Sequence, residues 1–186
     1  TVATGISYTA YRLFLDMKGG IVERFQSLPI SRSAVLWAHV LTSLVAGIVS
    51  LAVVIGAGLV MGFRTCATFT GWVAIIGIVM LFTLALTWIA VIAGLSAKTV
   101  DGASAFSYPL IFLPFVSSAF VPTDTMPGPV RSFAENQPVT SIVNTIRALF
   151  TNQPVGTDIW VALAWCLGIL VVAYVVAVTL YRRKVS

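Results

Sequence analysis

Long apolar stretches separated by short polar segments set the pattern of this chain. Four stretches contain no Asp, Glu, Lys or Arg, and they cover residues 34–62, 71–95, 103–121 and 159–181. A helix of about 20 residues crosses a hydrocarbon core of about 30 Å, and continuous apolar runs differ from the alternating strands of a membrane β-barrel. The pattern therefore predicts an all-α integral membrane protein, a polytopic helix bundle with four full spans in this sequence.

The remaining segments complete a single predicted transmembrane domain over residues 1–186. Residues 1–13 are too few to cross a membrane, and we interpret them as the tail of an earlier span. A charged segment follows at 14–32, and a long segment at 122–157 separates the last two spans. The chain begins with Thr instead of Met, which indicates that it is part of a longer protein.

Residues 18–32 are dense in charge and lie directly before the first span. Glycines at 19 and 20 and the proline at 29 enclose a stretch with room for a helix of about two turns. Its apolar residues fall at i, i+1, i+4 and i+7 and share one face: Ile21, Val22, Phe25 and Leu28. The pattern predicts a short amphipathic helix in the cytoplasm that docks a partner. A plain interfacial helix without a partner is the alternative.

The segment over 122–157 holds five of the eight prolines and also carries a helical pattern. After Pro138, at a favoured first helical position, apolar residues repeat at i, i+3, i+4, i+7, i+10 and i+11. These residues are Val139, Ile142, Val143, Ile146, Leu149 and Phe150. Because the helix is too short to span, the pattern predicts an outer helix that is interfacial or re-entrant and packs against the spans.

Two further patterns concern how the spans bend and pack. Pro109 and Pro114 lie inside the third apolar stretch, where their missing N–H groups are expected to bend the helix. The first span carries small residues four positions apart, which let helices approach closely. These pairs are Ser43 and Gly47, Ala52 and Gly56, and Gly58 and Gly62. They mark a candidate packing face within or between subunits.

Composition and charge support these predictions and orient the spans. Of the 186 residues, 59% are hydrophobic and 9% are charged, whereas a soluble domain has about 25% charged residues. Lys and Arg in short loops stay cytoplasmic, and alternating the loops places eight basic residues inside and three outside. The opening segment and the C-terminus are therefore predicted to be cytoplasmic. The net charge of +5 follows from this bias and does not indicate nucleic-acid binding.

Residues that carry chemistry are sparse in this chain. The single histidine, His39, lies near the inner end of the first span, and no metalloprotease or nucleophile-elbow motif occurs. Cys66 falls in an outer loop and Cys166 within the last span, at a depth that argues against a disulfide. Ion-coupled transport usually leaves a charged residue inside the membrane. Energy for any work on a solute is therefore expected to come from a partner.

The order of these features resembles a known family. Gly-Gly-x-x-Glu-Arg-Phe and then Leu-Pro-Ile-Ser-Arg precede the spans, at residues 19–25 and 28–32. On the outer side stand the run FVPTDTMPG at 120–128 and the run ENQPVT at 135–140, which leads to IRAL at 146–149. Together they resemble the permease subunits of type-2 ABC exporters, particularly the drug-resistance branch of that family.

The resemblance implies a six-span permease that forms a dimer with a second copy or a paralogue. It also implies a cytoplasmic ABC ATPase subunit, which would bind ATP and Mg, while this chain binds no cofactor. The family pattern assigns ATPase coupling to Gly20, Glu23, Arg24 and Phe25. It assigns an outer gate segment to Pro138, Ile142, Ile146 and Arg147.

We therefore expect a multi-pass permease in the plasma membrane of a bacterium. It would move an amphipathic drug, lipid or glycan-type molecule outward by an ATP-driven mechanism. No residue is expected to form a catalytic or metal site, so the chain itself is not predicted to be an enzyme. A non-transporting membrane scaffold or accessory subunit is the alternative hypothesis.

Overall fold

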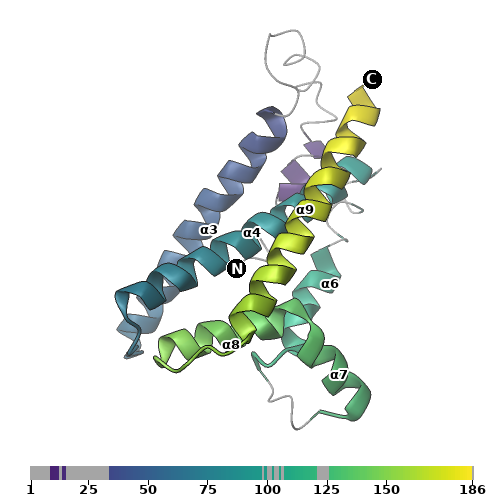
Figure 1. Cartoon of the computed structure of the whole chain (residues 1–186). Coiled ribbons are helices and arrows are strands. Elements are labelled where there is room, and N and C mark those ends of the chain that lie inside the picture. Colours follow the sequence, from purple (N-terminus) through teal and green to yellow (C-terminus); the bar gives the residue numbers. More distant parts are fainter. Residues whose placement is uncertain are drawn as a thin grey trace. The chain divides into compact units, whose positions relative to one another are not determined.

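The computed structural model shows a set of helices (Figure 1). It describes residues 9–12, 14, 15, 34–97, 99, 102, 105, 107–120 and 126–185. The elements are α3 (Ala34–Val60), α4 (Phe69–Ser96), α6 (Ser107–Phe112), η1 (Leu113–Val116), α7 (Gly128–Asn136), α8 (Pro138–Phe150) and α9 (Asp158–Val185). Every element in these residues is helical, and η1 is a 3-10 helix, so the predicted all-α class is confirmed.

Three of these helices are long and apolar enough to cross a membrane. Their candidate spans are Trp37–Val60 in α3, Phe69–Ser96 in α4 and Asp158–Arg183 in α9. Each coincides with one of the predicted apolar stretches. A helix is the expected form there because it satisfies its backbone hydrogen bonds internally, as a hydrocarbon environment requires.

The fourth predicted span, residues 103–121, has a different form where it is described. α6 has six residues and continues as η1, a 3-10 helix of four residues that ends at Val116. Pro114 lies at the start of η1 and brings no N–H group. The Ser117 N–H and hydroxyl both donate to the Pro114 carbonyl, at 3.2 and 2.6 Å. These described helical turns are too short to span, so a fourth span is not seen in them.

The chain divides into two compact units, and α3, α4 and α9 contribute residues to both. The first unit comprises Thr1–Leu51, Thr83–Tyr108 and Ile169–Ser186. The second comprises Ala52–Phe82 and Pro109–Gly168. The second unit contains η1, α7 and α8 and therefore holds the predicted outer helix.

The core of the first unit is built around Trp88 of α4, which is 1% exposed. Its ring lies edge-on to Trp37 of α3, with ring centroids 5.5 Å apart, and to Tyr174 of α9, at 4.9 Å. Edge-to-face contacts of this kind are the arrangement that aromatic ring charges favour. The three aromatic side chains thus connect the parts of α3, α4 and α9 that belong to this unit.

Close helix contact in the first unit uses one of the predicted small-residue pairs. A Cβ atom added at Gly47 would lie 3.3 Å from Thr83 Cγ2, tighter than most real contacts. One turn earlier, the Ser43 and Thr9 hydroxyl oxygens are 2.7 Å apart. Gly56, by contrast, has no such neighbour within 4 Å. The pair Ser43 and Gly47 therefore serves packing within this chain.

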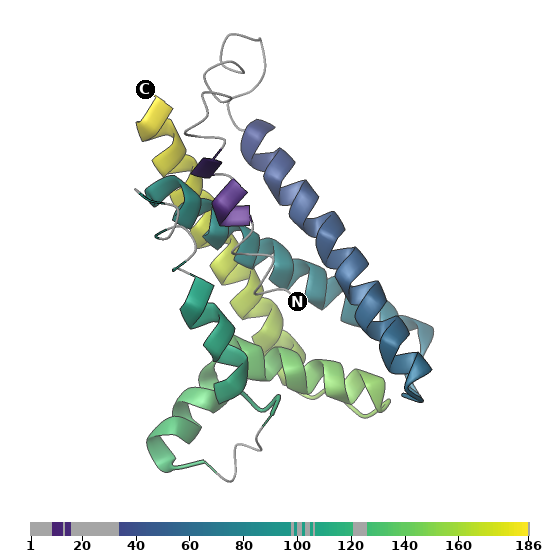
Figure 2. The same cartoon turned by 180° about the vertical axis from the view of Figure 1, so that it is seen from behind.

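The connection between α3 and α4 packs against the end of α8 in the second unit (Figure 2). Gly62 has a φ of 90°, a left-handed conformation that glycine adopts without a steric penalty. The Cys66 N–H donates to the Phe150 carbonyl at 3.0 Å. The Phe63 and Trp72 rings both lie edge-on to the Phe150 ring, with centroids 5.5 Å apart. These contacts fix the C-terminal end of α8.

Candidate functional site

The residues predicted to couple the chain to an ATPase lie outside the residues that the structure describes. They are Gly20, Glu23, Arg24 and Phe25, and their role stays a prediction. All four residues of the predicted outer gate segment belong to α8 and are described. The candidate site is therefore α8 and the segment that it contacts.

The α8 helix begins and ends where the apolar pattern predicts. Pro138 is its first residue. The fixed φ of proline suits this position, and the N–H that proline lacks would have had no acceptor within the helix. Gln137 precedes it as the N-cap, in an extended conformation with a ψ of 150°. After the last turn, Asn152 adopts a φ of 53°, which takes the chain out of the helix. The predicted helix over 138–150 is confirmed.

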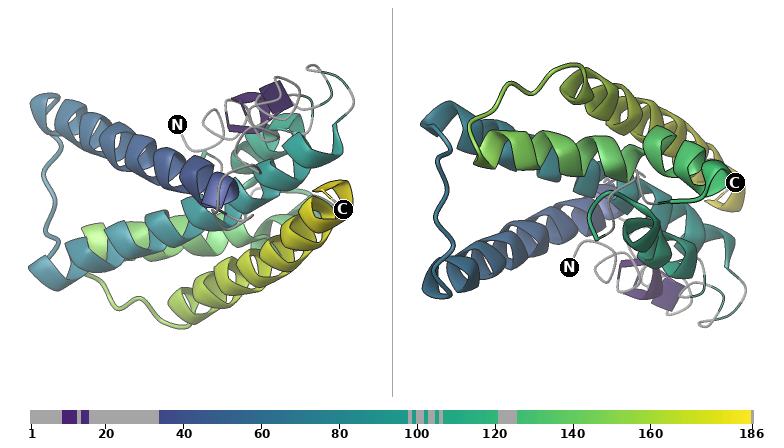
Figure 3. Two further views of the ribbon diagram at one scale, coloured as in Figure 1. Left: turned by 90° about the horizontal axis from the view of Figure 1, so that it is seen from above. Right: turned by 90° about the horizontal axis from the view of Figure 1, so that it is seen from below.

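One face of α8 is apolar and packs inside the second unit, beside the first halves of α4 and α9 (Figure 3). Ile142 is 5% exposed and shares a core with Ile78 of α4 and with Ala162 and Cys166 of α9. Ile146 packs against the same core. Full burial of a side chain of this size contributes about 1.5–3 kcal/mol. This apolar face therefore holds α8 to both long helices.

A second face of α8 is polar and bonds to residues 113–118. Its members are Gln137, Thr140, Asn144 and Arg147. They stand at i, i+3, i+7 and i+10 and therefore lie along one side of the helix. The Gln137 Nε2 donates to the Val116 carbonyl at 2.9 Å. The Thr140 hydroxyl oxygen accepts from the Ser118 N–H at 3.4 Å. We call these four residues and their bonds the polar ladder.

Ser118 is the main partner in the outer half of the polar ladder. Its hydroxyl donates to Asn144 Oδ1 at 2.8 Å, and its carbonyl accepts from Arg147 Nη2 at 3.2 Å. With the Thr140 contact, this one residue bonds to three consecutive members of the ladder. Arg147 carries the only formal charge in the ladder and is exposed, whereas Gln137 and Thr140 are buried. The ladder thus runs from the protein interior to the surface.

The end of η1 explains why a polar face is needed there. The last carbonyls of a helix have no partner within it, and η1 ends at Val116, directly before Ser117. Gln137 supplies amide donors to the Val116 carbonyl and, at a longer 3.5 Å, to the Leu113 carbonyl. The end of η1 is therefore capped by the side chain of Gln137, at the start of another helix.

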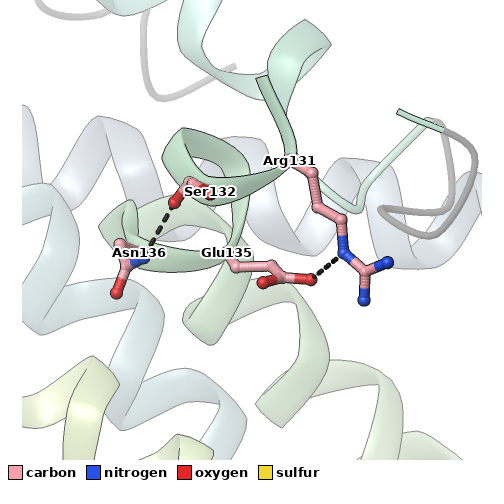
Figure 4. Close-up of polar contacts among 4 residues, drawn as sticks. All are labelled: Arg131, Ser132, Glu135 and Asn136. Atoms are coloured by element: carbon pink, nitrogen blue, oxygen red, sulfur yellow. Dashed lines mark hydrogen bonds and ion pairs between the residues drawn. The ribbon is translucent and has the colours of Figure 1, made fainter. Parts of the chain in front are cut away.

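The preceding helix, α7, carries its own exposed polar contacts (Figure 4). Arg131 Nε lies 2.7 Å from Glu135 Oε1, and Asn136 Nδ2 donates to the Ser132 carbonyl at 2.8 Å. The two charged side chains are 46% and 44% exposed. An exposed pair at this spacing contributes about 0.3–0.5 kcal/mol. These bonds support α7 locally and lie outside the polar ladder.

The four predicted gate residues make different contacts in the structure. Pro138 starts the helix, Ile142 and Ile146 enter the core, and Arg147 bonds to residues 113–118. Sequence reasoning assigned no gate role to three ladder residues and their partner, although two of them lie in the run ENQPVT: Gln137, Thr140, Asn144 and Ser118. The regular polar spacing along α8 was the available signal for the first three. No spacing rule identifies Ser118, because its position depends on where η1 ends.

Reactive side chains do not gather in the described part of the chain. No group of three or more His, Cys, Asp or Glu residues there could hold a metal ion. Cys66 is exposed and Cys166 is buried, and both are free thiols. What the site offers chemically is a set of reversible hydrogen bonds between two segments.

Comparison with known proteins supplies a family for this arrangement. A family model described as "ABC-2 type transporter" matches residues 1–151. The chain is 29% identical over 181 residues to the daunorubicin resistance ABC transporter permease protein DrrB1 of Streptomyces coeruleorubidus, covering 95% of this chain and 63% of that protein. It is 27% identical over 183 residues to the probable doxorubicin resistance ABC transporter permease protein DrrC of Mycobacterium tuberculosis, covering 97% and 65%.

The chain thus spans slightly less than two thirds of the length of these curated relatives. No solved structure matches it significantly.

Proposed function

Because this chain belongs to the ABC-2 type transporter family, we propose that it is a membrane-spanning permease subunit of an ATP-driven exporter. The family match carries the proposal, and both relatives described above are named as ABC transporter permease proteins. Three helices with the length and composition of membrane spans fit that role. A permease of this kind provides the path for a solute and leaves the energy-yielding reaction to another subunit.

We assign the source of energy to a separate cytoplasmic ABC ATPase subunit that binds ATP and Mg. α3 and α4 contain no Asp, Glu, Lys or Arg, and α9 carries such residues only near its two ends. Carriers driven by protons or ions ordinarily keep charged groups within the membrane. Residues 18–32 are then the docking element for the ATPase, with Gly20, Glu23, Arg24 and Phe25 in the coupling role.

The proposed assembly is a bacterial plasma-membrane complex with a second permease copy or a paralogue. The basic residues at the C-terminal end of α9, Arg182 and Arg183, support a cytoplasmic C-terminus, because basic side chains stay on the inner side. That orientation places the start of α9, and with it α7 and α8, toward the outer side. α8 is therefore on the side where a substrate would leave.

The geometry of α8 supports a role as the outer gate. Its apolar face holds it to α4 and α9, while its polar face holds residues 113–118 through separate hydrogen bonds. Each such bond has a net value of about 0.5–1.5 kcal/mol, so the ladder opens at a cost that ATP-driven movement can supply. We propose that opening separates residues 113–118 from α8 and that reforming the ladder closes the exit.

The proposed substrate is an amphipathic molecule such as a drug, a lipid or a glycan-type carrier. The names of the relatives refer to resistance against daunorubicin and doxorubicin, which favours a drug-type substrate here. The apolar character of α3 and α4 fits a path for molecules with a large apolar part. Neither helix offers the charged groups that would select a small ion.

Reconstitution of the full-length protein with its copurifying ATPase tests this function. Glu23→Ala or Phe25→Ala should leave the protein inserted and ATP hydrolysis active, because both changes act on the docking element. ATP-dependent uptake of an amphipathic dye into inside-out vesicles should fall to background in both variants. Gln26→Ala, a change of similar size in the same segment, is the control and should retain uptake.

Two outcomes of this experiment contradict the proposal. Normal uptake in both Glu23→Ala and Phe25→Ala vesicles would remove the coupling role from residues 18–32. Absence of any copurifying ATPase and of ATP-dependent uptake by the unaltered protein would favour an accessory subunit without transport activity.

A further inference from the structure

One buried polar atom at the start of α8 has no partner. The Gln137 side chain is 4% exposed, and its Oε1 is the only fully buried side-chain nitrogen or oxygen without a hydrogen bond in the described part of the chain. Buried amide oxygens in native proteins are nearly always bonded, because removal from water without a partner destabilises the fold. The position therefore calls for a donor that the described residues do not supply.

The orientation of the Gln137 amide follows from its neighbours. Nε2 lies 2.9 Å from the Val116 carbonyl and 3.5 Å from the Leu113 carbonyl. Rotating the amide by half a turn would place Oε1 against these two carbonyl oxygens, and none of the three atoms could donate. Oε1 is thus fixed as the acceptor on the side away from both carbonyls.

The N-terminus of α8, which directly follows Gln137, provides hydrogen-bond donors. The first N–H groups of a helix have no acceptor within it, and the Gln137 side chain makes no capping bond to them. The residues of this first turn are buried, with Val139 at 8%, Thr140 at 4% and Ser141 at 5% exposure. Gln137 Nε2 lies 3.4 Å from the Thr140 hydroxyl oxygen, which places the amide at this turn.

The acceptor Gln137 Oε1 and the N–H donors of the first turn of α8 together favour one chemical class of ligand. A hydroxyl group can donate to Gln137 Oε1 and accept from an N–H of the helix start, whereas an ether or a ketone can only accept. An ammonium group can donate, but the partial positive charge of a helix N-terminus opposes a cation there. The acceptor and donors together fit a neutral alcohol.

We propose that Gln137 and the first turn of α8 form a binding site for a neutral aliphatic hydroxyl group. In transport, that hydroxyl belongs to the exported molecule, which reaches the site when the Ser118 bonds of the ladder have broken and Gln137 Nε2 still donates to the Val116 carbonyl; this part rests on the proposed function. Binding of the hydroxyl then satisfies Oε1 in this partly open state. The closed ladder leaves Oε1 unpaired, so the site favours release of the ladder when an alcohol is present.

Photolabelling of the full-length complex in vesicles tests this site without relying on transport. The probes are dodecanol and methyl dodecyl ether, each carrying a diazirine at the same chain position, so that they differ only by a methyl group in place of the hydroxyl hydrogen. Ser118→Ala removes the hydroxyl bond to Asn144 and leaves the Gln137 bonds intact, so it weakens the ladder and should make its opening more frequent without ATP. Labelling of residues 113–150 is read by mass spectrometry at equal probe concentration in the membrane.

We expect the alcohol to label this segment of Ser118→Ala about two- to tenfold more than the ether, the range that one net hydrogen bond supports. Adding Gln137→Met should bring the ratio to about one, because Met has nearly the shape of Gln but no amide. Adding Gln153→Met, the same change at an exposed glutamine after α8, should leave the preference for the alcohol unchanged.

Equal labelling by the two probes in Ser118→Ala would overturn the site and would mean that only water meets Oε1. A preference that persists in Ser118→Ala with Gln137→Met would also overturn it, because the hydroxyl would then bind elsewhere. Should Gln137→Met fail to fold, the ratio measured in Ser118→Ala alone decides the question. Transport is not required for any of these results, so failure of the proposed function would be seen separately.

Discussion

At the scale of single residues, the missing side chain of Gly47 determines how closely α3 meets α4 in the first unit. Its backbone faces Thr83 at a distance where a Cβ atom would already be crowded. Gly56 lies on the same helix with open space around the position of a Cβ. Two glycines that look equivalent in the sequence therefore differ in what they do.

Substitution of these glycines should separate the two situations. Gly47→Leu should lower the free energy of unfolding of the full-length protein by about 1–3 kcal/mol, the usual cost of overpacking. Gly56→Leu should have a much smaller effect, because nothing obstructs the first side-chain atom. Thermal unfolding in detergent, followed by tryptophan fluorescence, measures both. Equal losses of stability would show that Gly47 is not a close packing position.

At the scale of elements, α8 combines two faces with different energies. Its apolar face is buried with α4 and α9, and each buried large side chain contributes a few times the net value of one hydrogen bond. Its polar face holds residues 113–118 by individual hydrogen bonds of small net value. The helix is thus attached by apolar burial on one side and by hydrogen bonds on the other, which fits the proposed gate.

Truncation on each face should reveal this difference. Ile142→Ala should reduce the free energy of unfolding by about 2–4 kcal/mol, because it leaves a cavity in the core of the second unit. Asn144→Ala, which removes one ladder acceptor, should cost about 0.5–1.5 kcal/mol. Thermal unfolding of the purified protein checks both values. If Asn144→Ala proves as destabilising as Ile142→Ala, the polar face is structural and not a reversible contact.

The helix of the candidate site was predictable from the sequence, whereas its polar contacts were not. The apolar period after Pro138 gave α8 its position, since burial of one face decides whether such a helix forms. Ser118 became a partner only because the backbone changes to a 3-10 helix near Pro114 and then stops. Hydropathy alone predicted a full span there and gave no information about this change of backbone, since apolar composition is insensitive to backbone hydrogen bonds that proline removes.

At the scale of the whole molecule, membership in the ABC-2 type transporter family unites these features. Three candidate spans provide a membrane body, and two of them contain no Asp, Glu, Lys or Arg. The energy is proposed to enter through residues 18–32 and the solute to leave beside α8. In this account, ATP-driven movement has to separate residues 113–118 from α8 during each cycle.

Cross-linking across the polar ladder tests that requirement most directly. Ser118→Cys and Asn144→Cys would replace two side chains whose polar atoms are 2.8 Å apart, in a protein whose own cysteines are replaced by Cys66→Ser and Cys166→Ala. The matched control, Ser132→Cys with Asn136→Cys, joins two positions one turn apart within α7. Both pairs are joined by a short, reducible thiol cross-linker in vesicles that also contain the ATPase.

The measurement is ATP-dependent uptake of an amphipathic dye by inside-out vesicles before cross-linking, after it, and after reduction. We predict that the link between Ser118→Cys and Asn144→Cys stops uptake, that reduction restores it, and that the link within α7 has no effect. Undiminished uptake with the ladder fully cross-linked would contradict the account, because the exit would then open without separating residues 113–118 from α8.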